Sequence, residues 1–156
     1  MTQKSDRPQP REDIVKIMVD KFNGFTDTDG FKKYQIRELV EDTAKLGKKL
    51  ARVDNLKTNQ IRKFLDAVNR LKFQLAKDPN NNFASIDSEL VFLRPKLAYA
   101  AARQRRDDRD LGPVEPLKQV LEAAIKKVND EKDFERLVQL IESIIAYHKE
   151  EGGKNQ

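Results

Sequence analysis

The chain has 156 residues, of which 38% are hydrophobic and 37% are charged, and its net charge is +5. It contains no cysteine, which excludes a disulfide framework and a cysteine-based metal site. Residues 1–13 have no apolar core and do not resemble a secretory signal, and no apolar run approaches the ~18 residues of a membrane-spanning helix. We therefore expect one domain, located in the cytoplasm and not associated with a membrane.

The positive charge is concentrated in part of the chain. Residues 1–106 hold 23 Lys and Arg against 14 Asp and Glu, whereas residues 107–156 hold 8 against 12. Residues 45–63 carry seven cations and one anion, and residues 94–106 carry five cations and no anion. This polarity suggests a polyanion on one side of the molecule and a protein partner on the other. A basic face that is merely solvated would give the same pattern.

The N-terminal segment, residues 1–30, is expected to be flexible, with one short helix. Residues 1–12 are polar and include two prolines, a composition typical of disorder. Apolar residues recur at helical spacing over residues 14–22, and an Asn-Gly pair ends the run. Residues 27–30 match part of a calcium loop. They lack its other acidic positions, so we interpret them as a turn.

Residues 31–150 are expected to form a helical bundle that begins with two long amphipathic helices. The first runs from about residue 31 to residue 52, and the second from about residue 59 to residue 77, with Thr58 as its N-cap. Cations occupy the face opposite the apolar stripe of the first helix and continue onto the second. The positions expected to face the core are Ile36, Leu39, Val40, Thr43, Gly47, Leu50, Ile61, Phe64, Leu65, Val68, Leu71 and Leu75.

Three further helices follow a polar loop at residues 78–82. Ser85 or Asp87 is the expected cap of the third helix, and Pro95 predicts either a kink near residues 91–94 or a helix that begins at Arg94. A charged exit and a linker lead to the fourth helix. Asp133 is the expected cap of the fifth.

The predicted fold is therefore all-α, a compact bundle of about five helices with a disordered N-terminal tail. The sequence has no β-type alternation of useful length. Residues 151–156 are expected to form a frayed C-terminal tail.

No set of residues supports catalysis. His148, the single histidine, falls near the end of the last predicted helix, and we interpret it as a surface residue that complements the helix C-terminus. Asp107, Asp108 and Asp110 are candidate Mg²⁺ ligands, as in a metal nuclease. They lie among arginines, where carboxylates usually neutralise neighbouring cations. We expect no catalytic residue, no metal and no cofactor.

Cations at helical spacing predict a surface that binds a nucleic-acid backbone without reading its sequence. Few aromatic side chains lie among these cations, so base stacking is not the expected main contact. Polar side chains at the start of the second helix can add hydrogen bonds, and the helix N-terminus itself favours an anion. The predicted RNA-binding residues are Lys48, Lys49, Arg52, Lys57, Asn59, Gln60, Arg62, Arg94, Lys96 and Arg103.

Three blocks of sequence, taken together, are informative about the family. They are LKTNQIRKFLDAVNRLK at residues 56–72, LRPKLAYAAAR at residues 93–103 and FERLVQLIESIIAYHK at residues 134–149. In this order, with a basic helix ahead of them, they closely resemble the small subunit of the type III-A CRISPR effector, the Csm complex. The resemblance covers roughly residues 36–149.

The resemblance implies a five-helix bundle that stacks in several copies beside a filament of backbone subunits holding the guide RNA. The small subunits would line the groove in which target RNA pairs with guide RNA, and they would not be nucleases. Cleavage would belong to the backbone subunits, and signalling and DNase activity to the large subunit. The family role transfers most directly to the cations of the matched blocks, which are Lys57, Arg62, Arg94, Lys96 and Arg103.

Other interpretations of the residues stay open. A helical protein–protein adaptor would have a basic face that is only solvated, and would bind its partner through an apolar patch. An architectural nucleic-acid-binding protein outside CRISPR would need no partner subunits. A nuclease that uses the carboxylates of residues 107–110 would require Mg²⁺.

Overall fold

The computed structural model describes residues 13–80 and 82–153, and these ranges are helical with no strand. The expected all-α bundle is confirmed. Among the helices of these ranges, none combines the length and the apolarity needed to cross a bilayer. The elements are α1 (Ile14–Asn23), the short 3-10 helix η2 (Phe31–Lys33), α2 (Ile36–Arg52), α3 (Thr58–Lys77), α4 (Ala84–Gln104), α5 (Glu115–Ile125) and α6 (Glu131–Glu150).

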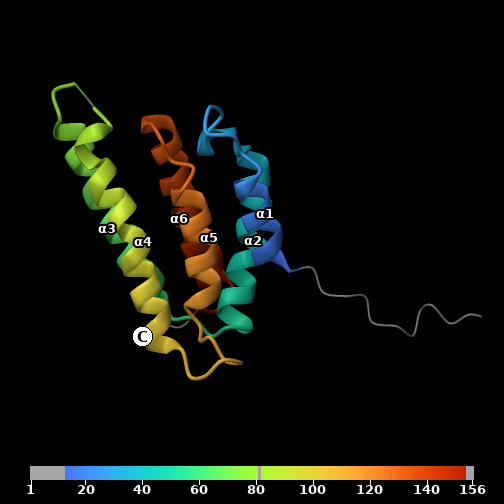
Figure 1. Cartoon of the computed structure of the whole chain (residues 1–156). Coiled ribbons are helices and arrows are strands. Elements are labelled where there is room, and N and C mark those ends of the chain that lie inside the picture. Colours follow the sequence, from blue (N-terminus) through green and yellow to red (C-terminus); the bar gives the residue numbers. More distant parts are fainter. Residues whose placement is uncertain (1–12, 81, 154–156) are drawn as a thin grey trace, which may run out of the picture.

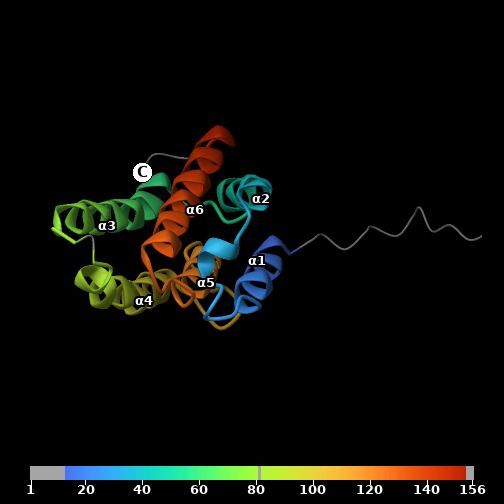
Figure 2. The same ribbon diagram turned by 90° about the horizontal axis from the view of Figure 1, so that it is seen from above.

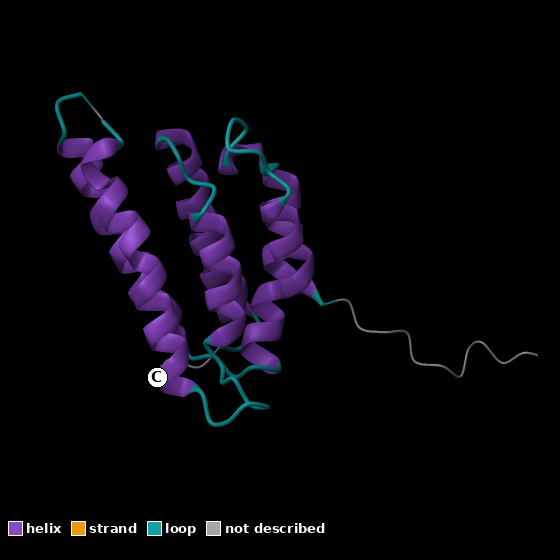
Figure 3. Ribbon diagram, in the orientation of Figure 1, coloured by secondary structure: helices purple, strands orange, loops and turns teal. Residues whose placement is uncertain are grey.

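The helices form two layers of three (Figures 1 and 2). In one layer α6 lies between α2 and α3, and in the other α5 lies between α1 and α4. The layers are joined at their edges, where α1 packs on α2 and α3 packs on α4. The connecting loops gather at the two ends of the bundle (Figure 3). As a result, α2 and α3 lie on opposite sides of α6, although a short turn connects them.

The apolar core lies between the two layers. All six α-helices contribute buried side chains to it. The short helix expected in the N-terminal segment is α1, and Met18 and Phe22 on it are fully buried, so α1 is part of the core. The predicted disorder of residues 1–12 lies outside the described residues.

A buried tyrosine joins α1, η2 and α2. The rings of Phe31 and Tyr34 both pack against Phe22, and the Tyr34 hydroxyl donates a hydrogen bond of 2.7 Å to Asp42. Lys21 completes this polar group with a 2.8 Å ion pair to the same carboxylate. Burial, together with the bond to Asp42, raises the pKa of Tyr34.

Several details of the first two long helices differ from the prediction. α2 begins at Ile36, not at residue 31, because Tyr34 and Gln35 are extended and separate it from η2. Ile36 and Val40 are exposed and lie outside the buried face of α2. The buried residues of that helix are Leu39, Asp42, Thr43, Leu46, Gly47 and Leu50. Thr58 is not the N-cap of α3 but its first residue, and it is buried.

The caps of the later helices also differ from the prediction. α4 begins at Ala84, whose N–H donates to the Asn82 side chain at 3.0 Å, and the helix continues without interruption through Pro95. A helix that begins at Arg94 is therefore wrong. The cap of α6 is Asp130, which accepts the N–H of Asp133 at 2.8 Å. Asp133 is not the cap: its side chain is buried and accepts the N–H of Lys32.

The C-terminal end of α6 is closed by a glycine turn. Gly152 has φ 86°, which is the left-handed conformation common after a helix, and the N–H of Gly153 donates to the carbonyl of His148 at 2.9 Å. A frayed tail is therefore not observed over residues 151–153. The rest of that predicted tail, residues 154–156, lies outside the described residues.

Candidate nucleic-acid interface

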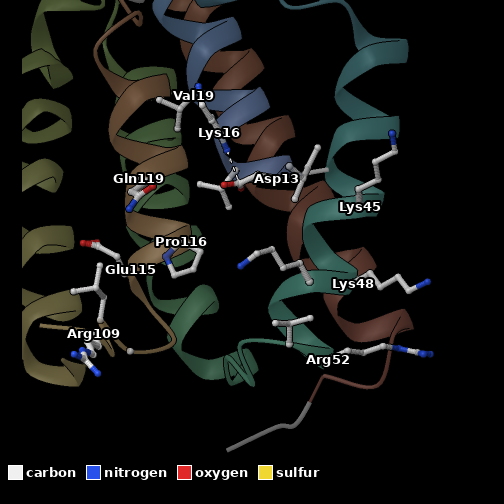
Figure 4. Close-up of a pocket in the computed structure, with 16 residues that line it drawn as sticks. Asp13, Lys16, Val19, Lys45, Lys48, Arg52, Arg109, Glu115, Pro116 and Gln119 are labelled. Carbon is white, nitrogen blue, oxygen red and sulfur yellow. Dashed lines mark hydrogen bonds between the residues drawn. The ribbon is translucent and has the colours of Figure 1, made fainter. Parts of the chain in front are cut away.

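A groove of about 1160 Å³ lies where α1, α2 and the segment leading into α5 meet (Figure 4). Two acidic residues, Asp13 and Glu115, contribute to its walls. Basic residues outnumber them, and most of these come from the C-terminal half of α2. The basic residues that line the groove are Lys16, Lys45, Lys48, Lys49, Arg52 and Arg109. The groove therefore has a cationic wall on α2.

Three cations of α2 form what we term the α2 basic stripe, namely Lys45, Lys48 and Arg52. They are spaced three and four residues apart, and Figure 4 shows them projecting to the same side of α2, away from Glu115. Lys48 is exposed and makes no ion pair with any described residue. Arg52 contacts Glu151 at 2.9 Å, yet 62% of its side-chain surface stays exposed. The stripe therefore presents positive charge to solvent.

Lys49 differs from these neighbours on α2. Its ammonium contacts both carboxylate oxygens of Asp54, at 3.0 and 2.8 Å, and the side chain is half-buried. This pair fastens the end of α2 to the turn that follows it. Lys49 remains a predicted RNA contact, but its geometry is that of a residue that positions the turn.

The start of α3 and the loop after α4 enclose a second, polar pocket of about 790 Å³. Lys57 and Asn59 line this pocket and are exposed. Gln60 also lines it, but its side-chain oxygen accepts the N–H of Lys57 at 3.1 Å and so caps α3. The pocket shares Val53 and Gly112 with the first groove, so the two depressions adjoin at this end of the bundle.

A third groove, about 430 Å³ in volume, lies between α3 and α4. Lys96 and Arg103, both predicted RNA contacts, line it together with Lys63 and Arg70. Arg62 is exposed on α3 outside these three depressions. The predicted continuous basic surface is therefore divided between the α2 edge and the α3–α4 edge, which lie on opposite sides of α6 and α5 (Figure 2).

Arg94 is separate from the other predicted RNA contacts. It is half-buried, and its guanidinium lies 3.5 Å from Glu122 on α5. Its Nε atom is buried without a hydrogen-bond partner among the described residues. The side chain thus faces α5 and joins the two helices, although its role in RNA binding stays a prediction.

The comparison with protein families gives one match. A family model described as Csm2 Type III-A matches residues 33–154, which include every element from α2 to α6. The chain belongs to this Csm2 family. It is thus a small subunit of a type III-A CRISPR effector, and other Csm subunits are its partners, so the resemblance seen in the sequence is confirmed. No curated protein and no solved structure matches the chain.

The histidine of this Csm2 chain is buried, so its predicted surface position is wrong. Its Nε2 atom contacts the carbonyl of Leu56, which can only accept a hydrogen bond, so Nε2 carries the proton. Nδ1 of His148 lies 3.4 Å from the Thr58 hydroxyl. The last turn of α6 packs beneath the turn between α2 and α3, which explains the burial. His148 follows Ile141 and Ile144 at spacings of seven and four residues, so the apolar periodicity of α6 already indicated the buried face.

The acidic cluster after α4 of this Csm2 chain organises its own loop. Asp107 accepts the N–H groups of Arg109 and Asp110, both at 2.8 Å, and these bonds lower the pKa of its carboxyl. Asp108 contacts Arg105 at 3.1 Å. These carboxylates neutralise neighbouring arginines, as predicted. Within residues 13–80 and 82–153, no three His, Cys, Asp or Glu side chains are grouped so that they could hold a metal ion.

Proposed function

We propose that this Csm2 subunit is non-catalytic and contacts the guide–target RNA of its complex through the α2 basic stripe and the adjoining start of α3. The observation that carries the proposal is the stripe itself, three cations on one face of α2 beside an open groove. Lysine and arginine at this spacing bind phosphates without reading bases, so the contact is independent of sequence.

The existing ion pair of Arg52 does not oppose this role. Arg52 stays mostly exposed, so its ion pair with the half-buried Glu151 contributes about 1 kcal/mol. A phosphate can therefore replace the carboxylate of Glu151 at little cost. Lys57 and Asn59, in the adjoining pocket, extend the contact toward the N-terminus of α3, where unpaired N–H groups also favour an anion.

The same proposal places the protein partners on other surfaces. Glu131, Glu135 and Glu142 line a groove between α6 and α3, together with the apolar side chains Phe134 and Val138. Phe134 and Val138 are buried and form the floor of the groove, and Lys72 is its one basic residue. This mainly acidic surface suits neighbouring protein, including further copies of the small subunit and the backbone and large subunits, in the cytoplasm. Self-association that is unchanged by Glu135→Lys/Glu142→Lys, measured by sedimentation, would contradict the self-contact.

The test of RNA contact is a salt series with the purified chain. We expect binding to single-stranded RNA and to an RNA duplex that weakens steeply with salt and is the same for unrelated sequences. Lys48→Ala/Arg52→Ala should lower the slope of log K against log salt by roughly 1.4 on single strands, about 0.7 per lost phosphate contact.

The matched control removes the same charge elsewhere. Lys33 and Lys132 are exposed cations outside the three depressions, so Lys33→Ala/Lys132→Ala should leave the slope at its parent value. Equal slopes for all three proteins would contradict the proposed surface. Salt-insensitive or absent binding in the parent would instead favour the adaptor interpretation, in which the basic face is solvated.

A further inference from the structure

One face of α4 alternates aromatic and cationic side chains. Phe92, Lys96, Tyr99 and Arg103 follow one another at spacings of four, three and four residues, which aligns them along the helix. The rings are large and exposed, 61% for Phe92 and 67% for Tyr99. The Lys96 ammonium lies 5.9 Å from the centroid of the Phe92 ring, and the Arg103 guanidinium 5.8 Å from that of Tyr99.

The opposite wall of the same groove belongs to α3. Lys63 and Arg70 stand two turns apart on it, and the small side chain of Ala67 between them leaves the groove open. Neither cation makes an ion pair with a described residue. Where the groove continues toward the start of α4, Glu89 is the one acidic residue in its lining. Positive charge therefore borders the two rings on both sides.

Proteins that bind single-stranded nucleic acid combine a cationic groove with exposed aromatic rings, and both are present here. A cationic groove follows the phosphates, and exposed rings stack on bases, a contact that is tolerant of sequence because every base has a flat face. The rings of Phe92 and Tyr99 are seven residues apart, or about 10 Å along the helix. Stacked bases repeat at about 3.4 Å. Each ring would therefore receive its own base from an extended strand.

We propose that the α3–α4 groove binds single-stranded nucleic acid, with Phe92 and Tyr99 each stacking on a base. Lys63, Arg70 and Arg103 hold the phosphates. A duplex hides the faces of its bases, so it cannot use the two rings. This site is separate from the α2 basic stripe, since α2 and α4 lie at different edges and in different layers of the bundle (Figure 2).

The chain offers a matched control for the test. Phe73 on α3 is 63% exposed and has the Lys77 ammonium 4.4 Å from its ring centroid, but it lies outside the groove. Fluorescence anisotropy of the full chain with labelled oligouridylate should show at least about five-fold weaker binding for Phe92→Ala and for Tyr99→Ala. Phe73→Ala and Tyr99→Phe should bind as the parent does.

A second measurement reports the stacking itself. Ultraviolet irradiation of the parent with a 5-bromouridine oligonucleotide should produce crosslinks at Phe92 or Tyr99, located by mass spectrometry. A parallel measurement of affinity for oligodeoxythymidylate distinguishes DNA from RNA as the ligand. Equal affinity indicates contacts to bases and phosphates alone, and a preference for RNA indicates an added contact to the 2′-hydroxyl.

Two results would overturn the proposal. One is parent-like binding of single strands by Phe92→Ala/Tyr99→Ala, and the other is crosslinks confined to α2. If, in addition, the double variant no longer enters the assembled complex, the surface faces a protein subunit. These outcomes are distinct from failure of the proposed function, because that is tested by the salt slope of variants at Lys48 and Arg52, which lie outside this groove.

Discussion

The ring of His148, on the last turn of α6, hydrogen-bonds to the backbone carbonyl of Leu56 in the turn between α2 and α3. This contact joins residues 92 positions apart in sequence. The turn that it holds connects the α2 basic stripe to the start of α3. A buried side chain in one helix thus sets the relative positions of two segments that carry predicted RNA contacts.

We expect His148→Ala to lower the free energy of unfolding by about 2–4 kcal/mol, because it leaves a cavity and an unpaired carbonyl. His148→Gln retains a side-chain N–H and should cost less. Urea denaturation followed by circular dichroism at pH 7 measures both. Equal midpoints for His148→Ala and the parent would mean that water replaces the ring without penalty.

Gly47 allows α2 to approach α6 closely. A Cβ atom at this position would lie 2.7 Å from the backbone nitrogen of His148 and 2.7 Å from the Cβ of Tyr147. Gly47→Ala should therefore destabilise the fold by about 1–3 kcal/mol in the same urea assay.

Gly24→Ala is the control for this prediction. A Cβ there meets its nearest atom, the carbonyl oxygen of Lys21, at 3.4 Å, and φ of Gly24 is −77°. We expect a change within about 1 kcal/mol, and of either sign. Similar losses for the two variants would show that the effect is general to glycine replacement and not specific to the α2–α6 contact.

The sequence predicted the helices well but not their caps. Apolar spacing placed α2, α3 and α6 because burial of one face dominates helix formation. A cap is instead a local choice between neighbouring polar residues, and at α6 both Asp130 and Asp133 fit the pattern. The Asp133 carboxylate instead accepts the N–H of Lys32, about 100 positions earlier in the chain. No local pattern contains that information.

The Lys32–Asp130 pair should make stability depend on pH in acid. Burial raises the pKa of Asp130, but its bonds from the Lys32 ammonium and the Asp133 N–H outweigh burial and hold the pKa below its ordinary value. A lowered pKa contributes stability above the unfolded-state pKa, and this contribution is lost as pH falls through the folded-state pKa. The loss should therefore begin below about pH 4.

Thermal melts of the parent and Asp130→Asn between pH 2 and 7 test this dependence. Asparagine remains a good N-cap, so the variant should fold, but the part of the acid-induced decrease in Tm that comes from Asp130 should disappear. Lys32→Met removes the ammonium that pairs with Asp130, so it should reduce the contribution of Asp130 to the acid-induced decrease in Tm. An identical decrease in all three proteins would assign the acid sensitivity to other carboxylates.

Arg94→Met should change neither stability nor RNA binding by much. Methionine fills the same space against α5 and removes a buried Nε atom that has no partner among the described residues. Glu122 keeps contacts to Lys118 and Lys126. We expect unfolding free energy within about 1 kcal/mol of the parent and an unchanged salt slope for RNA. A slope lowered by about 0.7 would instead support the RNA contact that the sequence predicted for Arg94.

The candidate binding surfaces were predicted in part. Charge density identified Lys48, Lys96 and Arg103 as surface cations, because lysine and arginine side chains are mostly exposed in folded proteins. It could not divide these residues between two edges, which depends on how the helices are layered. The role that we propose for Phe92 was not predicted from the sequence, although its spacing from Lys96 and Tyr99 along one face of α4 was readable there.

Pro95 lies inside α4, where its missing N–H leaves the carbonyl of Val91 without its helical partner. Pro95 is exposed, so the position tolerates this loss. Pro95→Ala restores the bond, and a helix-interior proline costs about 3 kcal/mol relative to alanine. Proline also stiffens the unfolded chain, which offsets up to about 1 kcal/mol. We expect a net gain of about 1–2 kcal/mol in unfolding free energy, measured with urea.

Pro116 provides the comparison, because it lies in the first turn of α5, where a helix does not need the N–H. Pro116→Ala should therefore be neutral or slightly destabilising. If Pro95→Ala is destabilising instead, the proline shapes α4 to fit its neighbours. Because Pro95 also lines the α3–α4 groove, single-strand binding by the same variant then decides whether that shape serves the groove or only the core.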